Sequence, residues 1–297
     1  MSWWRRFLVR GVFWRQFLRW AVLNVPMWIE PAAMAWWSAF FLLWGPGRRG
    51  VMRNLAAIKP RSWAITNFFR VYRVFWNYAW TITDNVRHRE QGMIPDWEFA
   101  GQEHFEALQS HSGGAIILTA HMGSYDLGAQ MFATYSTRRI VMVRAPEADP
   151  ETRNFEESRL TDRVQVTFNT EAADLALDLL SALRDGEVIA IQGDRVTEGI
   201  VSVETTLFGK RTRVPSGPFA LAMVARAPIY PLFVIRRGRR AYRLLTCPPI
   251  EVVRTSANRH DDIGRAVEQW SRALETTLRD TWHQWFAFEP FYEERAA

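Results

Sequence analysis

Apolar and polar positions are grouped in a regular way from about residue 100 to the C-terminus. Short apolar runs, typical of strands buried on both faces, alternate with longer stretches that have apolar residues at helical spacing. This alternation predicts an α/β fold with a mostly parallel central sheet flanked by helices. The predicted strands are 97–101, 115–119, 139–144, 164–168, 187–192, 229–236 and 242–246, and the predicted helices are 102–110, 127–132, 150–161, 171–184, 218–227 and 258–282.

The N-terminal part has a different pattern. Residues 1–20 contain five arginines, four tryptophans and no acidic residue, as in a basic amphipathic helix that lies on anionic lipid. Residues 32–44 form an uncharged apolar stretch of 13 residues, shorter than the roughly 20 that a spanning helix needs. We therefore predict a helical membrane-anchoring segment over 1–50, embedded or interfacial, and an α/β domain over 51–297. The alternative for the apolar stretch is a buried hairpin of an ordinary core.

Between these parts, residues 60–91 have a helical pattern rich in aromatic residues. We interpret it as a core helix that packs against the sheet. Further along, Gly209 and Lys210 predict a hairpin turn in an otherwise loosely patterned segment.

Composition narrows the class of partner. The chain has a formal charge of +6 and 15 tryptophans, and this combination with arginine is typical of a membrane interface. Its basic residues are not arranged in a nucleic-acid-binding motif, so we expect an anionic membrane surface as partner and no nucleic acid. The single cysteine, Cys247, excludes an internal disulfide, and the six scattered histidines suggest no metal site.

The candidate chemistry is concentrated in residues 113–135. His121 directly follows a predicted buried strand, and Asp126 lies in the first turn of the helix that comes next. Residues five apart do not share a helix face. A histidine before the helix can nevertheless fold back, so that Asp126 accepts a hydrogen bond from one ring nitrogen and leaves the other as a base. Alternatively both residues are structural, with Ser124 as a helix cap and Asp126 favoured by the helix dipole.

Two further predicted strands end in charged residues. Arg144 closes one of them, and Asp194 and Arg195 follow another. Parallel strands place their carboxyl ends at one edge of the sheet, which is where ligands bind in open α/β folds. We therefore expect these three residues to lie beside His121 and to bind the polar head of a lipid.

A reaction at this edge would also need donors for a developing oxyanion. Backbone N–H groups near Gly123 are one candidate. Those at the helix start by Ser216 and Gly217 are the other.

Taken together, six blocks of the chain resemble the bacterial lipid A biosynthesis (late) acyltransferases, within the lysophospholipid acyltransferase superfamily. The resemblance covers most of the chain and includes a hydrophobic N-terminal anchor. The blocks are HMGSYD at 121–126, RIVMVRAP at 139–146, GEVIAIQGDR at 186–195, FGKRTRVPSGPFALA at 208–222, APIYPLFVIR at 227–236 and TWHQWFAF at 281–288.

The resemblance implies a membrane-associated O-acyltransferase that acts on a lipid acceptor. Such an enzyme moves a fatty acyl chain from an acyl-carrier-protein or CoA thioester to a hydroxyl, or an amine, of a glycolipid, and needs no other cofactor. It further implies that His121 takes the acceptor proton, that Asp126 orients it, and that Arg144 and the pair Asp194 and Arg195 line the acceptor side. We expect such an enzyme at the cytoplasmic face of the bacterial inner membrane.

One departure concerns the acceptor. Family members that act on lipid A usually have Asp-Gln or Asp-His followed by a second acid, where this chain has Gln192, Gly193, Asp194 and Arg195. The sequence therefore leaves open whether the acceptor is a lipid A precursor or another glycolipid or aminolipid. Two other functions also stay open: a lipid hydrolase that uses the same residues on water, although the chain has no G-x-S-x-G motif, and a non-catalytic membrane-surface module.

Overall fold

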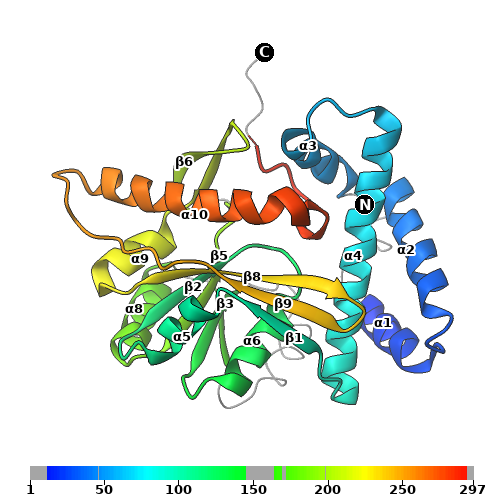
Figure 1. Ribbon diagram of the computed structural model, residues 1–297, viewed down its shortest axis with the longest axis horizontal. Helices are drawn as coiled ribbons and strands as arrows, with labels where there is room; N and C mark the ends of the chain where they lie inside the picture. Colours follow the sequence, from blue (N-terminus) through cyan, green and yellow to red (C-terminus); the bar gives the residue numbers. More distant parts are fainter. Residues whose placement is uncertain (1–11, 46, 145–163, 169–171, 198, 293–297) are drawn as a thin grey trace.

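The computed structural model describes residues 12–45, 47–144, 164–168, 172–197 and 199–292. In these residues a twisted seven-stranded sheet carries helices on both faces, and a separate layer of N-terminal helices packs at one end of it (Figure 1).

The sheet has the order β1-β9-β8-β2-β5-β3-β4, and its five strands from β8 to β4 are parallel. β9 runs antiparallel to β8, and β1 runs parallel to β9. This confirms the predicted α/β fold with a mostly parallel sheet. The strands are β1 (Asp96–Ala100), β2 (Ala115–Thr119), β3 (Ile140–Arg144), β4 (Val164–Phe168), β5 (Val188–Gln192), β8 (Ile229–Gly238) and β9 (Ala241–Thr246), with a separate hairpin of β6 (Ser202–Leu207) and β7 (Lys210–Pro215).

The central strand β2 explains why its sequence is apolar at every position. Ile116 and Leu118 face a core cluster shared with α8 (Ala172–Arg184), α9 (Gly217–Ala225) and α10 (Arg259–Thr281). Ala115 and Ile117 face the opposite cluster, shared with α5 (Gln102–Ser110) and α6 (Tyr125–Tyr135). Because both faces are covered, all five side chains of the strand are buried.

Most of the predicted elements have counterparts in the structure. The predicted helix over 102–110 coincides with α5, and the hairpin turn lies at Gly209, whose φ of 69° is readily adopted only by glycine. The helix predicted over 150–161 lies outside the described residues.

Four helices form the N-terminal layer: α1 (Val12–Asn24), α2 (Glu30–Trp44), α3 (Arg48–Ile58) and α4 (Ala64–Gln91). α4 contacts each of the other three helices. One buried cluster contains residues from three of the helices: Leu42 of α2, Val51 of α3 and Phe75 of α4. The predicted domain boundary after residue 50 therefore falls inside α3, which packs with the helices on either side of it.

Within the described residues, no helix combines the length and the apolar character that crossing a membrane requires. The predicted interfacial or embedded anchor stays a prediction, and the first eleven residues of its basic amphipathic part lie outside the described residues.

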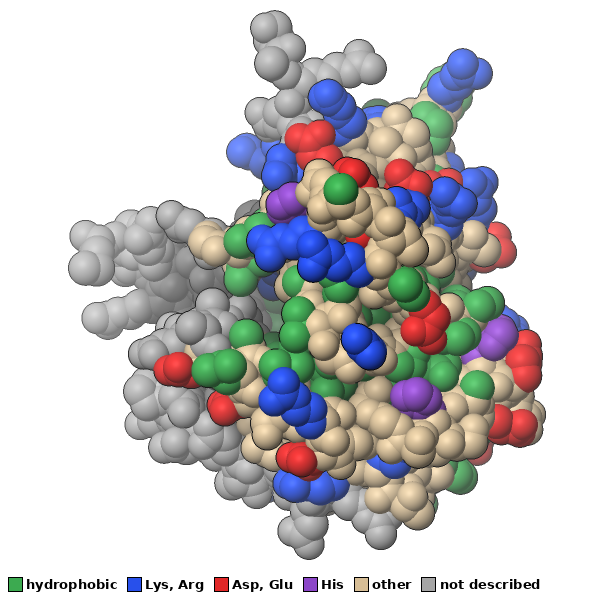
Figure 2. Space-filling view, turned by 90° about the vertical axis from the view of Figure 1, so that its left-hand side faces the viewer, with side chains coloured by type: hydrophobic (Ala, Val, Ile, Leu, Met, Phe, Trp, Pro, Cys, Tyr) green, Lys and Arg blue, Asp and Glu red, His purple; other side chains and the backbone are tan. Residues whose placement is uncertain are grey.

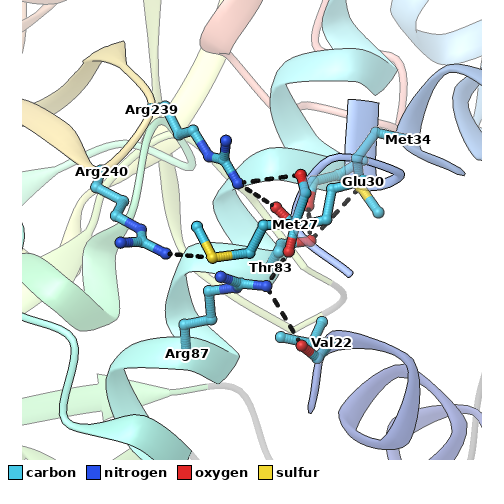
Figure 3. A network of polar contacts seen from close by, with 9 residues as sticks. Val22, Met27, Glu30, Met34, Thr83, Arg87, Arg239 and Arg240 are labelled. Carbon is cyan, nitrogen blue, oxygen red and sulfur yellow. Dashed lines mark hydrogen bonds and ion pairs between the residues drawn. The ribbon is translucent and has the colours of Figure 1, made fainter. Parts of the chain in front are cut away.

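A buried ion cluster fixes the start of α2 to the rest of the molecule (Figure 3). Glu30, which is almost fully buried, accepts hydrogen bonds from Arg87 of α4 and, at 2.7 Å, from Arg239 in the β8–β9 turn. Arg87 also donates to the carbonyl of Val22 in α1. A carboxylate removed from water is strongly destabilising unless it is paired, so this cluster holds α1, α2, α4 and the sheet in one arrangement.

Candidate active site

Strand register brings His121 and Asp194 together. β2 and β5 are adjacent parallel strands in which Thr119 pairs with Gln192, and the ladder continues as the N–H of Gly193 donates to the carbonyl of Thr119 at 2.8 Å. His121 and Asp194 each lie two residues beyond this last pair. They therefore leave the sheet at the same level of its carboxyl edge.

Three hydrogen bonds join the two residues. Nδ1 of the His121 ring lies 2.7 Å from Oδ1 of Asp194, and the backbone N–H of His121 donates to both carboxylate oxygens at 3.0 Å. Because an ionised carboxylate only accepts, Nδ1 carries the proton and Nε2 is left as the basic nitrogen. The His121 side chain is 24% exposed and that of Asp194 is 1% exposed, so the pair presents only the histidine to solvent.

The segment after α10 closes over this pair. The indole N–H of Trp285 donates to Oδ2 of Asp194 at 2.7 Å, and the N–H of Phe286 donates to the carbonyl of His121 at 2.7 Å. The carbonyl of Gln284 accepts from the N–H of Gly123 at 3.2 Å. The C-terminal segment thus holds the loop by backbone hydrogen bonds at His121 and at Gly123.

The electrostatics favour an ionised Asp194. Burial alone would raise the pKa of this carboxyl, but the charge of His121, with the hydrogen bonds from His121 and Trp285, holds the pKa below its usual range. A buried carboxylate that stays ionised can stabilise an imidazolium as it forms. The pair therefore has the chemistry of a general base and its orienting carboxylate.

The turn that carries His121 requires glycine. Gly123 has a φ of 54°, and a Cβ built there would lie 1.7 Å from the carbonyl oxygen of Val234 on β8. No side chain fits that approach, so the loop can pass close to the sheet edge only with glycine at this position.

Asp126 occupies a second polar cluster. It accepts a hydrogen bond from Arg89 of α4 at 2.9 Å and another from Arg144 at the end of β3. The prediction that Asp126 would accept from the His121 ring differs from the structure, in which Asp194 holds that position. The reason is that Asp126 points from the first turn of α6 toward the two arginines, whereas Asp194 is brought to His121 by strand pairing.

Comparison with known proteins assigns the chain to a family. The family model of the bacterial lipid A biosynthesis acyltransferases matches residues 39–293. The chain belongs to this family. A phosphatidylinositol mannoside acyltransferase from Mycobacterium tuberculosis is 25% identical over 184 residues, which cover 59% of this chain and 57% of that relative. The aligned part is thus little more than half of the relative's length.

In this member of the family, α4 connects the N-terminal layer to the site. Near its C-terminal end Asn85 accepts a hydrogen bond from the hydroxyl of Ser124, and Arg89 contacts Asp126. Ser124 in turn caps α6 by accepting from the N–H of Leu127 at 3.3 Å, as its position before the helix suggested. One helix therefore positions the first turn of α6 at two points.

The other predicted site residues have different surroundings. Asp194 is buried and paired with His121 and Trp285, so it cannot also contact a lipid head group. Arg195, the next residue, is partly exposed at the same edge. Arg144 ends β3, and since Ile140 pairs with Val188 of β5, it lies level with Gln192.

Some of the backbone N–H groups predicted as oxyanion donors already donate hydrogen bonds within the protein. The N–H of Gly123 is taken by Gln284, and the N–H and the hydroxyl of Ser216 both contact the carbonyl of Val201, the hydroxyl at 3.0 Å. At Gly217, which begins α9, an added Cβ would meet open space. Its role as a donor stays a prediction.

Sequence reasoning missed several residues of this candidate site. Trp285, Asn85 and Arg89 contact it from segments far away in the chain, and only the first belongs to a block that was singled out by resemblance. Nothing in the spacing of Asn85 or Arg89 within an amphipathic helix distinguishes them from other polar residues on its surface.

Proposed function

We propose that this protein transfers a fatty acyl group from a thioester to a hydroxyl of a membrane lipid, with His121 as the general base. The observation that carries the proposal is the hydrogen bond between Nδ1 of His121 and the buried Asp194, which leaves Nε2 as a base at a partly exposed position. Membership of the lipid A biosynthesis acyltransferase family supports the reaction class.

The chemistry follows from this arrangement. Nε2 of His121 takes the proton of the acceptor hydroxyl while the oxygen attacks the thioester carbonyl carbon. The tetrahedral intermediate collapses with cleavage of the C–S bond, and the imidazolium returns its proton to the leaving thiolate. Asp194 stabilises the imidazolium in between and keeps its own charge. No nucleophilic serine or cysteine is needed, because the substrate brings its own hydroxyl.

We propose that the arginines at Asp126 bind the acceptor. Arg89 and Arg144 both contact the carboxylate of Asp126, and these three side chains are each 21–24% exposed. A guanidinium presents paired N–H groups that match a phosphate. The carboxylate holds both guanidinium groups in place before the substrate arrives.

The acceptor we propose is a phosphate-containing glycolipid. The name of the Mycobacterium tuberculosis relative indicates a phosphatidylinositol mannoside, which has both a phosphate and sugar hydroxyls. The donor is an acyl-carrier-protein or CoA thioester, and an amine acceptor would follow the same proton transfer. The reaction would take place at the cytoplasmic face of the bacterial inner membrane.

The test is a reconstituted assay with mass spectrometry of the products. Purified protein is incubated with acyl-CoA or acyl-carrier protein and with either a phosphatidylinositol mannoside or a lipid A precursor. We expect an acylated glycolipid, formed at least about a hundredfold more slowly by a His121→Ala variant. Free fatty acid formed without any acceptor would indicate a hydrolase, and unchanged product with the variant would exclude His121 as the base.

A further inference from the structure

α2 is apolar on both of its faces. After Glu30 its sequence contains no charged residue. Ser38 and Leu42 are buried on the side of α4, whereas Trp36, Phe40 and Leu43 form an exposed stripe on the opposite side. Trp36 is 66% exposed. A helix that is apolar all round normally has both faces covered, so the outer stripe points to a partner.

The start of α4 exposes a second apolar stripe. Two residues mark the side of α4 that contacts α2. Thr83 donates a hydrogen bond to the sulfur of Met34, and the ring centroid of Phe75 lies 5.9 Å from that of Phe41. Steps of three and four residues continue this side toward the helix start. They reach three exposed apolar residues: Ile65, Phe68 and Phe69.

The exposed apolar stripes of α2 and of the start of α4 face the same side of the molecule. α2 ends at Trp44, three residues after Phe41, whereas α4 has eleven residues before Phe75. The side of α4 that packs on α2 therefore runs past the end of α2, as Figure 1 shows, and its apolar residues are exposed there. The outer face of α2 and this exposed part of α4 both point away from the sheet side of α4. We call Trp36, Phe40, Leu43, Ile65, Phe68 and Phe69 the outer apolar surface.

Charge identifies the kind of partner. Residues 1–83 contain twelve Lys and Arg and a single acid, Glu30, which is buried under two arginines; residues 84–297 contain 25 basic and 30 acidic residues. The N-terminal part thus has an excess of eleven positive charges on a protein whose remainder is negative. This is complementary to an anionic lipid surface, toward which basic side chains and aromatic rings act together.

The opposite side of the molecule has a different character. Figure 2 shows hydrophobic side chains there interspersed with basic and acidic ones. The large exposed hydrophobic residues of α8, α9 and the loop before α10 are Leu177, Val224 and Val253, one on each element and none aromatic. Single exposed aliphatic residues of this kind are normal on a soluble surface and need no partner.

We propose that the outer apolar surface inserts into the interface of an anionic bilayer, with both α2 and the first turns of α4 in contact with lipid. The lipid contact therefore extends well beyond the predicted anchor over 1–50. This inference uses the proposed function only in that the acceptor is a membrane lipid. Insertion and catalysis are measured separately below.

The experiment uses the full chain with a single label. Cys247 is the only cysteine, so Cys247→Ser gives a cysteine-free background. Phe40→Cys, Phe69→Cys and, as control, Leu177→Cys are labelled with an environment-sensitive dye and mixed with phosphatidylcholine vesicles that contain phosphatidylglycerol. We expect brominated lipid chains to quench the labels at 40 and 69 and not the label at 177.

Two outcomes would overturn the proposal. If the label at 69 stays in water while the one at 40 is quenched, α4 has no part in insertion. If the labels become protected without lipid as protein concentration rises, a second copy of the chain covers the surface instead of a bilayer. Failure of acyl transfer by itself leaves these readings unaffected, because no labelled position touches His121 or Asp126.

A matched pair of variants tests the contribution of α4 to binding. Phe68→Ser with Phe69→Ser should weaken vesicle binding at least about tenfold, since two exposed phenyl groups lose their transfer into lipid. Leu177→Ser should leave binding unchanged. Acyl transfer to a detergent-dispersed acceptor should be retained in both, which separates a loss of membrane contact from a loss of folding. Equal binding of the double variant and the control would contradict the proposal.

Discussion

Two carboxylates at the carboxyl edge of the sheet have opposite surroundings. Asp194 is buried, bonds the ring and backbone of one histidine and accepts an indole N–H. Asp126 is about a quarter exposed and lies between two arginines. The first can stabilise a proton transfer, whereas the second can hold cations ready for an anionic group. Proximity to His121 along the chain is thus a poor guide to which carboxylate serves it.

The difference has a geometric origin. Asp126 is only five residues from His121, but the turn at Gly123 and the start of α6 direct it toward α4 and β3. Asp194 is 73 residues away and arrives through the pairing of β2 with β5. Functional pairs in parallel sheets are set by register between neighbouring strands, which sequence spacing does not encode.

The largest expected effect is that of His121→Ala. Removing the base should lower the rate of acyl transfer by at least about a hundredfold. The protein should stay folded, because the His121 side chain is partly exposed at the edge of the sheet. Product formation in the reconstituted assay measures the rate. His111→Ala, in the loop before β2, is the matched control and should be fully active. Acyl transfer near the normal rate by His121→Ala would show that His121 is not the base and that Asp194 does not serve one.

The variants Asp194→Asn and Asp126→Asn distinguish the roles of the two carboxylates. An amide at 194 cannot stabilise the imidazolium, so kcat should fall about a hundredfold with little change in the KM for the acceptor. An amide at 126 releases the arginines, so the acceptor KM should rise while kcat changes little. Steady-state kinetics with varied acceptor distinguish these results. The reverse pattern would show that Asp126 serves the reaction and that Asp194 is structural.

Arg144→Lys tests whether the cluster of Asp126, Arg89 and Arg144 binds the acceptor. An ammonium cannot make the planar two-point contact of a guanidinium, so the acceptor KM should rise by about tenfold, with the donor KM unchanged. Arg213→Lys, an exposed position on β7, provides the control. An equal rise in the KM of both substrates would mean that Arg144 supports the site as a whole and does not bind the acceptor.

The smallest expected effect is on acid stability. The folded pKa of Asp194 is depressed, so its contribution to stability is present above its ordinary value of about 3.9 and is lost as pH falls through the folded pKa. The free energy of unfolding should therefore drop more between about pH 6 and about pH 3 in the native protein than in Asp194→Asn. Urea titrations at both pH values measure this, and identical drops would show that His121 and Trp285 do not favour the ionised carboxylate.

The spacing of apolar residues along the chain was sufficient to predict much of the fold. Runs such as Ala115–Thr119 are buried on both faces in the structure because helices cover both, which is the condition that an unbroken apolar run implies. Glycine at 209 likewise marks a turn that needs positive φ. The fold class and most strands could be predicted for these local reasons.

The site was less predictable, because its decisive contacts are long-range. The sequence singled out His121 and Asp194 separately, but their pairing depends on strand order, which periodicity does not contain. Trp285 depends on the path of the chain after α10, and Arg89 on the packing of α4 against α6. The sequence placed residues 60–91 against the sheet, and in the structure α4 also packs with α2 and α3 in one buried cluster.

The length of α4 has a consequence for how this chain can vary. Phe69 lies near one end of the helix, in the outer apolar surface, and Asn85 and Arg89 lie near the other, at α6. Each residue of a helix adds about 100° of rotation and about 1.5 Å of length. Inserting one residue between Phe75 and Asn85 would turn the two ends out of phase, whereas inserting seven would nearly restore their relative orientation about 10 Å further apart. Changes of length in this helix should therefore be tolerated, if at all, in whole heptads.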